Sequence, residues 1–100
     1  MSLKIKYAVF VKIDISDTVK WYNKAKKGLG EAFLKTLKKQ LLYIKENPEA
    51  SQIRYLDVRI SILKTYPYTI YYQYFENEKL IYVLGIFHTS LIPDKWPYRL

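Results

Sequence analysis

The sequence predicts an α+β domain, β-α-α-β-β-β, in which a helical hairpin packs on one face of a four-stranded antiparallel sheet. Three observations lead to this prediction. Residues 66–88 contain two runs of β-branched and aromatic residues around the polar segment 76–79, a pattern typical of two strands joined by a tight turn. Residues 19–46 carry apolar side chains at helical spacing. The helices come early and the strands late, an order typical of α+β domains.

The first strand is expected at residues 7–13, where β-branched and aromatic residues dominate. Asp14, Ser16 and Asp17 follow, and their side chains can bind the free backbone amides at the start of a helix. The first helix is therefore expected to begin in this segment and to end near Lys27.

Gly28 and Gly30 interrupt the helical pattern, so we expect a corner between two helices there. The second helix should run from about Glu31 to Glu46, and Asn47-Pro48 should end it. Its apolar stripe is formed by Phe33, Leu37, Leu41 and Ile44.

A single strand is expected at residues 53–63, followed by the strand pair of residues 66–88. In the first strand of this pair, alternation assigns one face to Tyr68, Ile70, Tyr72 and Tyr74. The second strand is apolar on both faces from Leu80 to Phe87, so it should lie inside the sheet. His88, the only histidine, follows at its end.

The composition is that of one basic domain spanning residues 1–100, with net charge +8 and a pI near 9.6. Such a charge favours a nucleic acid, an acidic protein or an anionic membrane surface as partner. The chain has no cysteine, no signal-peptide pattern and no apolar run of the ~20 residues that span a membrane. We therefore expect a cytoplasmic protein without a membrane partner.

The positive charge is concentrated in the predicted helices, which carry eight lysines and one acid, Glu31, between Val19 and Lys45. Three of the lysines lie opposite the apolar stripe of the second helix: Lys35, Lys38 and Lys39. This side is either a solvated helix face or a docking face for a polyanion or an acidic partner.

The candidate reactive residues exclude most catalytic chemistries. One histidine, no cysteine and scattered acids do not form a zinc site, and Gly28-Leu29-Gly30 lacks the context of a phosphate-binding loop, so no metal or cofactor is expected. The remaining set is basic and rich in tyrosine: Arg54, Arg59, Lys64, His88, Tyr98 and Arg99.

Such a set can cleave RNA without metal. The reaction needs a base for the 2′-hydroxyl proton, a cation beside the phosphate and an acid for the leaving oxygen. Histidine titrates in the required range, and arginine can hold a phosphate through two donors. The alternatives are that His88 is a surface or hydrogen-bonded residue and that Arg59 pairs with an acid such as Asp57 or Glu46.

One ordered set of residues resembles a known family. It consists of Trp21-Tyr22, Gly28-Leu29-Gly30, Phe33, Leu37, Pro48, Arg59, Tyr66-Pro67-Tyr68, Ile70, Tyr72, the segment from Val83 to His88, Pro93, Trp96 and Arg99. With this set, between Tyr7 and Arg99, the chain resembles the RelE/ParE toxins of bacterial type II toxin–antitoxin modules. The resemblance implies the β-α-α-β-β-β fold, and a cognate acidic antitoxin that folds on the toxin and forms a hetero-oligomer with it.

The resemblance implies two possible activities. RelE-like members cut messenger RNA on the ribosome, and ParE-like members inhibit DNA gyrase without catalytic residues. By position, Arg59 matches a phosphate-contacting arginine, His88 an acid/base and Tyr98 a C-terminal tyrosine, while Leu91 stands where the family usually has another arginine.

Ribosome-dependent RNA cleavage is the first hypothesis, because Arg59, Lys64, His88 and Tyr98 are expected to meet at one edge of the sheet. Lys35, Lys38, Lys39, Arg54 and Arg99 would then bind nucleic acid or the partner. Gyrase inhibition is the alternative, and a basic nucleic-acid-binding domain without toxicity is a third interpretation.

Overall fold

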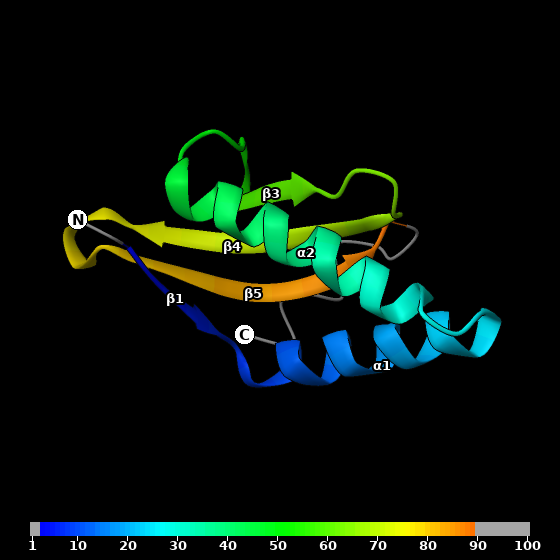
Figure 1. Cartoon of the computed structure of the whole chain (residues 1–100). Coiled ribbons are helices and arrows are strands. Elements are labelled where there is room, and N and C mark those ends of the chain that lie inside the picture. The colour runs from blue at the N-terminus through cyan, green and yellow to red at the C-terminus, as the bar shows by residue number, and fades with distance from the viewer. Residues whose placement is uncertain (1–2, 90–100) are drawn as a thin grey trace.

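The protein folds into a five-stranded sheet with two antiparallel helices on one face (Figure 1). The structure, a computed structural model, describes residues 3–89. Its elements are β1 (Lys4–Tyr7), α1 (Val9–Ala25), α2 (Leu29–Glu46), β2 (Ile53–Tyr55), β3 (Val58–Ile62), β4 (Tyr68–Phe75), the short 3₁₀ helix η1 (Glu76–Glu78) and β5 (Leu80–His88). The predicted α+β class and the helical hairpin are confirmed.

The sheet has one strand more than predicted, and its strands follow the order β1-β5-β4-β3-β2. Neighbouring strands from β5 to β2 are antiparallel, whereas β1 pairs with β5 in parallel, with Ile5 opposite Ile81. The prediction of four strands, all antiparallel, was therefore wrong at the two edges of the sheet.

The first strand lies earlier than predicted. Residues 9–13, expected to be a strand, form the first turns of α1. Val11 is fully buried there and Ile15, four residues later, packs on the same core. Helical spacing of these two contacts overrides the β propensity of the local sequence.

The predicted helix start was also too late, because Asp14, Ser16 and Asp17 lie inside α1. Ala8 precedes the helix and supplies no side-chain cap. Within the helix, the hydroxyl of Thr18 donates to the carbonyl oxygen of Asp14, one turn earlier, at 2.8 Å.

The corner between α1 and α2 is built around Asn23 and two glycines. Gly28 adopts a φ of +93°, which side-chain-bearing residues rarely adopt. The side-chain oxygen of Asn23 accepts hydrogen bonds from the backbone amides of Gly28 at 3.1 Å and Gly30 at 2.8 Å. A Cβ on Gly30 would collide with the backbone carbonyl of Val19, so the two helices cross closely only because this residue is glycine. The predicted corner is confirmed.

The segment expected to be one strand at 53–63 is a tight hairpin of β2 and β3. Leu56, in the turn, has a positive φ of 51°, and the next residue, Asp57, accepts a hydrogen bond from the Gln73 side chain at 2.8 Å. The alternating sequence pattern gave no sign of a turn at Leu56, because this residue has no preference for that conformation.

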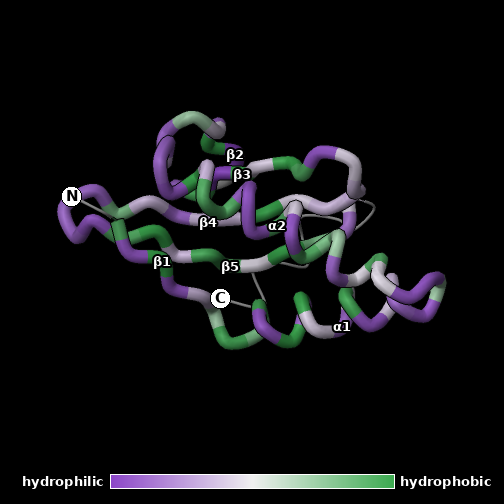
Figure 2. The backbone as a smooth tube through the Cα atoms, viewed as in Figure 1, coloured by the Kyte–Doolittle hydropathy of each residue, from purple (hydrophilic) through white to green (hydrophobic). Residues whose placement is uncertain are grey.

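Strands β4 and β5 form the centre of the core. The predicted face of β4 is confirmed, since Tyr68, Ile70, Tyr72 and Tyr74 all pack in the main cluster with α2 and Val11. Figure 2 shows α2 alternating between hydrophobic and hydrophilic segments, as expected for a helix with one face on this core. A second cluster consists of Val58, Tyr71, Leu84 and Phe87, which alternation places on the opposite face of the sheet.

Candidate functional site

Arg59 lies on β3, half-buried, and holds the loop that follows α2. Its Nη1 atom donates to the carbonyl oxygen of Ser51 at 2.7 Å and to that of Glu49 at 3.3 Å. Tyr72, its register partner on β4, donates its hydroxyl to the carbonyl oxygen of Pro48 at 3.0 Å. The guanidinium is therefore bonded to backbone carbonyls instead of to the acids considered from the sequence, and it has a structural role.

His88 ends β5 and caps a cluster of aromatic rings. Its ring meets that of Tyr68 edge to face, with centroids 5.2 Å apart. The aromatic cluster consists of Trp21, Tyr22, Phe33, Tyr66, Tyr68 and His88. This aromatic cluster joins both helices to the end of the sheet. His88 is therefore part of the packing there.

The structure does not bring Arg59 and His88 together. Arg59 pairs with Tyr72 and His88 pairs with Tyr68, so the two residues are four positions apart along β4 and lie on the strands on either side of it. At about 3.3 Å per residue and 4.8 Å between strands, their Cα atoms are about 16 Å apart. One phosphate could contact both side chains only if the Arg59 guanidinium left the carbonyl oxygens of Ser51 and Glu49.

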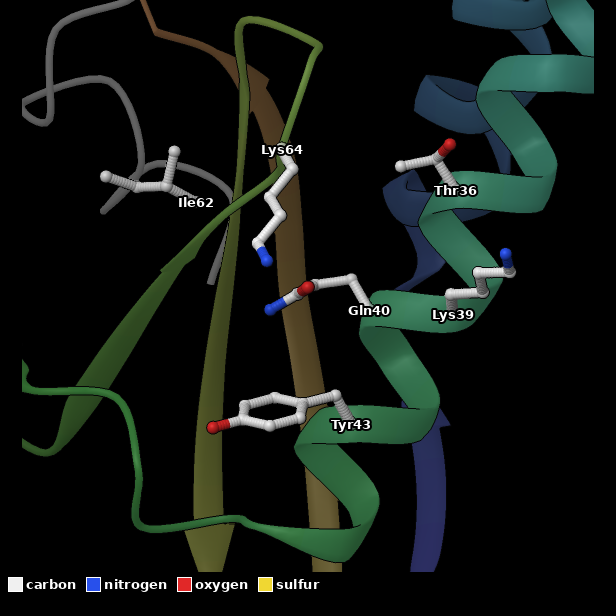
Figure 3. Close-up of a pocket in the computed structure, with 6 residues that line it drawn as sticks. All are labelled: Thr36, Lys39, Gln40, Tyr43, Ile62 and Lys64. Atoms are coloured by element: carbon white, nitrogen blue, oxygen red, sulfur yellow. The ribbon is translucent and has the colours of Figure 1, made fainter.

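Lys64 lies at the same end of the sheet as His88, in the connection after β3. The backbone amide of Leu63 donates to the carbonyl oxygen of Tyr68 at 2.9 Å, which fixes this end of β3 beside β4. Lys64 extends into a groove of about 420 Å³ between α2 and β3. The groove is lined by Thr36, Lys39, Gln40, Tyr43, Ile62 and Lys64 (Figure 3).

The remaining predicted site residues do not form one constellation. Lys35, Lys38 and Lys39 are exposed on α2, and only Lys39 borders the groove. Arg54 is exposed on β2. Tyr98 and Arg99 lie outside the described residues. Lys39 and Lys64 are thus the predicted site residues that the structure places around one cavity.

Four residues of this region were not predicted as site residues: Thr36, Gln40, Tyr43 and Ser61. The first three follow each other at spacings of four and three, which places them on one stripe of α2. Ser61 is the small polar residue in the middle of β3, and its hydroxyl accepts a hydrogen bond from the Gln40 amide at 2.7 Å. The polar stripe was the feature of the sequence that could have indicated these site residues. It was difficult to recognise because the same helix carries several lysines.

Burial affects several tyrosine hydroxyls. It raises the pKa of Tyr72, an effect opposed by hydrogen bonding at Ser51 and by the Arg59 charge. Burial also raises the pKa of Tyr22, and the neighbouring Tyr68 and Tyr66 raise it further. These groups therefore remain neutral hydrogen-bond donors at physiological pH.

The described part of the chain has no group of three or more metal-ligating side chains. Within residues 3–89, neither helix is both long enough and apolar enough to cross a membrane.

Comparison with known families gives one match over most of the chain. A family model described as the ParE toxin of type II toxin–antitoxin systems, parDE, matches residues 5–93. No curated protein sequence matches the chain.

Solved structures share the fold at low sequence identity. The chromosomal ParDE system from P. aeruginosa aligns with a TM-score of 0.74 and 16% identity, over 86% of this chain and 95% of that one. The intact E. coli RelBE toxin–antitoxin complex aligns with a TM-score of 0.63 and 20% identity, over 89% and 99%. A mutant of the E. coli toxin RelE in complex with an antitoxin RelBc peptide aligns with a TM-score of 0.65 and 18% identity, over 100% and 96%. At these identities the likeness establishes the fold.

Proposed function

The chain belongs to the ParE toxin family of type II toxin–antitoxin systems, and we propose on this basis that it stops bacterial growth by binding DNA gyrase in the cytoplasm without catalysing a reaction. The main support is the position of Arg59, about 16 Å from His88 by strand geometry and bonded to the carbonyls of Ser51 and Glu49. The charges that RNA cleavage would need beside one phosphate are thus apart, whereas an inhibitor that acts by binding needs no such convergence.

An acidic antitoxin is the proposed partner that keeps the toxin inactive. The net charge of +8 favours an acidic polypeptide, and two of the similar solved structures are described as toxin–antitoxin assemblies. Binding would neutralise part of the lysine charge on α1 and α2. The protein would then exist in cells as a hetero-oligomer until the antitoxin is lost.

The direct test uses purified protein, gyrase and relaxed plasmid. The expected result is loss of supercoiling and accumulation of gyrase–DNA cleavage complexes that detergent releases as linear plasmid. Protein saturated beforehand with the polypeptide encoded by the adjacent reading frame is the control and should restore supercoiling. Normal supercoiling by gyrase with a molar excess of the free protein would contradict the proposal.

The variant His88→Ala tests whether the activity is enzymatic. A protein that acts by binding should stop growth within about two-fold of the parent, because removal of a catalytic acid/base costs roughly 10²–10⁴-fold and this histidine would not be one. The measurement is colony survival after induction, at expression levels matched by immunoblot. Loss of growth arrest by a variant that keeps its circular dichroism spectrum and melting temperature would contradict a binding mechanism.

Ribosome-dependent cleavage of messenger RNA is the second candidate. The observation that favours it is the shared position of Lys64 and His88 at one end of the sheet, two strands apart across Tyr68. In this mechanism the lysine would stabilise phosphate charge and the histidine would move a proton. Mapping of messenger RNA ends after induction distinguishes the two candidates, since new cut sites that disappear in His88→Ala would favour cleavage.

A further inference from the structure

The end of α1 carries an exposed aromatic side chain that the core of the protein does not use. Trp21 is 62% exposed, whereas Tyr22, the next residue, packs against the core. The two rings meet edge to face, with centroids 5.1 Å apart, so Tyr22 supports the indole from one side. Packing within the protein does not explain an exposed indole, and such rings are enriched on surfaces that bind other molecules.

The corner that follows Trp21 is strongly positive. Between Asp17 and Glu31 every charged residue is a lysine, and all four lysines are exposed: Lys20, Lys24, Lys26 and Lys27. Among the residues that the structure describes, none of these ammonium groups forms an ion pair or a hydrogen bond. Lys24 is one turn from Lys20 and three residues from Trp21, so it lies beside both on the helix surface. An anionic ligand that contacts the indole would therefore meet positive charge.

Hydrogen bonds hold the backbone of this corner in place. The backbone amide of Lys26 donates to the carbonyl oxygen of Tyr22, and that of Leu29 to the carbonyl oxygen of Lys26, both at 3.1 Å. Together with the two amides bound by Asn23, these bonds fix the positions from which the lysines extend. Figure 1 shows the corner reaching past the end of the sheet, where a large ligand has access to it. Such a ligand would bind a preorganised surface, which reduces the entropy lost on binding.

We propose that this corner binds a single strand of nucleic acid, with one base stacked on Trp21 and the neighbouring phosphates held by the lysines. Proteins that bind single strands combine these two features, because every base has a flat face and every phosphate carries a charge. DNA and RNA strands share this chemistry. The inference goes beyond the proposed function and does not rest on it.

The surroundings of Trp21 favour a single strand over a duplex and over an acidic polypeptide. In a duplex the bases are stacked on one another, so the indole would have no base to receive. Asp17 lies one turn before Trp21 and separates it from the exposed Ile13, and Ala25 lies one turn after it. A polypeptide would therefore find one isolated ring instead of a contiguous apolar patch.

The test measures the binding of four probes to the full chain by fluorescence. The sequence has two tryptophans, so the variant Trp96→Phe leaves Trp21 as the only one, and its emission then reports on stacking. The probes carry equal charge: oligodeoxythymidylate, oligouridylate, a DNA duplex and a polyglutamate peptide.

The variants Trp21→Ala and Lys24→Gln test the two parts of the surface, and the anisotropy of dye-labelled strands measures their affinity. Ile13→Ala is the matched control for the first, because Ile13 is an exposed apolar residue of the same helix. Lys4→Gln is the matched control for the second, because Lys4 is an exposed lysine on β1.

Both single strands should quench the emission of Trp21. Trp21→Ala should weaken their binding about ten-fold, within the range measured for the loss of one base–aromatic stack. Lys24→Gln should lower the slope of log K against log salt by about 0.7, the value for one phosphate of a single strand. Ile13→Ala should leave the affinity unchanged, and Lys4→Gln should leave the slope unchanged.

Saturation with both single strands without quenching of Trp21 would overturn the proposal, and this measurement does not depend on the folding of Trp21→Ala. Equal changes of slope in Lys24→Gln and Lys4→Gln would overturn it too, since the effect would then be general electrostatics. Binding of the duplex or of polyglutamate as tightly as the single strands would assign the corner to that partner instead. None of these measurements contains gyrase, so the proposed function is tested separately.

Discussion

At the residue scale, Arg59 and Tyr72 show how polar groups inside the fold organise a loop. Both side chains bond to backbone carbonyls of residues 48–51, so the segment after α2 is held against the sheet. Tyr72 is fully buried, and its hydroxyl reaches the carbonyl of Pro48 as its hydrogen-bond acceptor. Arg59, a candidate reactive residue in the sequence, is thus explained by its bonds to two backbone carbonyls, beside the bond of Tyr72 to a third.

The variant Tyr72→Phe should lower the free energy of unfolding by about 1 kcal/mol, the usual net value of one hydrogen bond in a folded protein. The measurement is urea denaturation followed by fluorescence. Tyr43→Phe is the matched control, because the Tyr43 hydroxyl has no hydrogen-bond partner among the described residues and its loss should change stability by less than about 0.5 kcal/mol. Equal losses in the two variants would contradict the role given to the Pro48 contact.

At the scale of elements, the features that depend on residue periodicity or on glycine could be predicted from the sequence. The helical stripe of α2, the alternation along β4 and the corner at Gly28 and Gly30 all follow from local patterns, and the structure confirms them. Each of these features is determined by residues close to it in the chain.

The wrong predictions concern features that distant residues decide. Residues 9–13 favour a strand locally. They are nevertheless helical, because Val11 and Ile15 pack in the core that they share with α2 and β5. The turn at Leu56 depends on a conformation that leucine seldom adopts. The groove between α2 and β3 could be predicted only in part, because its floor pairs Gln40 with Ser61 across 21 positions.

The helix crossing gives a prediction about Gly30. Gly30→Ala should destabilise the protein by about 1–2 kcal/mol, because the new Cβ meets the Val19 carbonyl and the helices must separate, which outweighs the gain of up to about 1 kcal/mol in helix propensity. Thermal denaturation measures the change. Lys35→Ala, on the exposed side of the same helix, should stay within about 0.5 kcal/mol of the parent, and a neutral or stabilising Gly30→Ala would contradict the close crossing.

At the scale of the whole molecule, four partly or fully buried tyrosines make stability depend on alkaline pH. Burial raises the pKa of each: Tyr7, Tyr22, Tyr71 and Tyr72. Below pH 10 these hydroxyls keep their protons in both states, and their contribution to stability is complete. Above pH 10 the unfolded chain loses these protons first, so the folded state is progressively disfavoured.

We therefore expect the free energy of unfolding to fall as the pH rises from 10 toward the raised pKa values. Urea denaturation at fixed ionic strength between pH 8 and 11 measures the decline. The variant Tyr22→Phe is the control, and its curve should fall less steeply than that of the parent because one titrating group is gone. Parallel curves for the two proteins would contradict the contribution of Tyr22.

The parallel pairing of β1 with β5 has a consequence for protein synthesis. The partner of the earliest strand is the latest strand of the described chain, and Lys4 to Tyr7 can be aligned only against Leu80 to Val83. A nascent chain on the ribosome can form the helical hairpin early, but its sheet stays incomplete until β5 emerges. The sheet would thus be completed in one late step, after β5 has been synthesised.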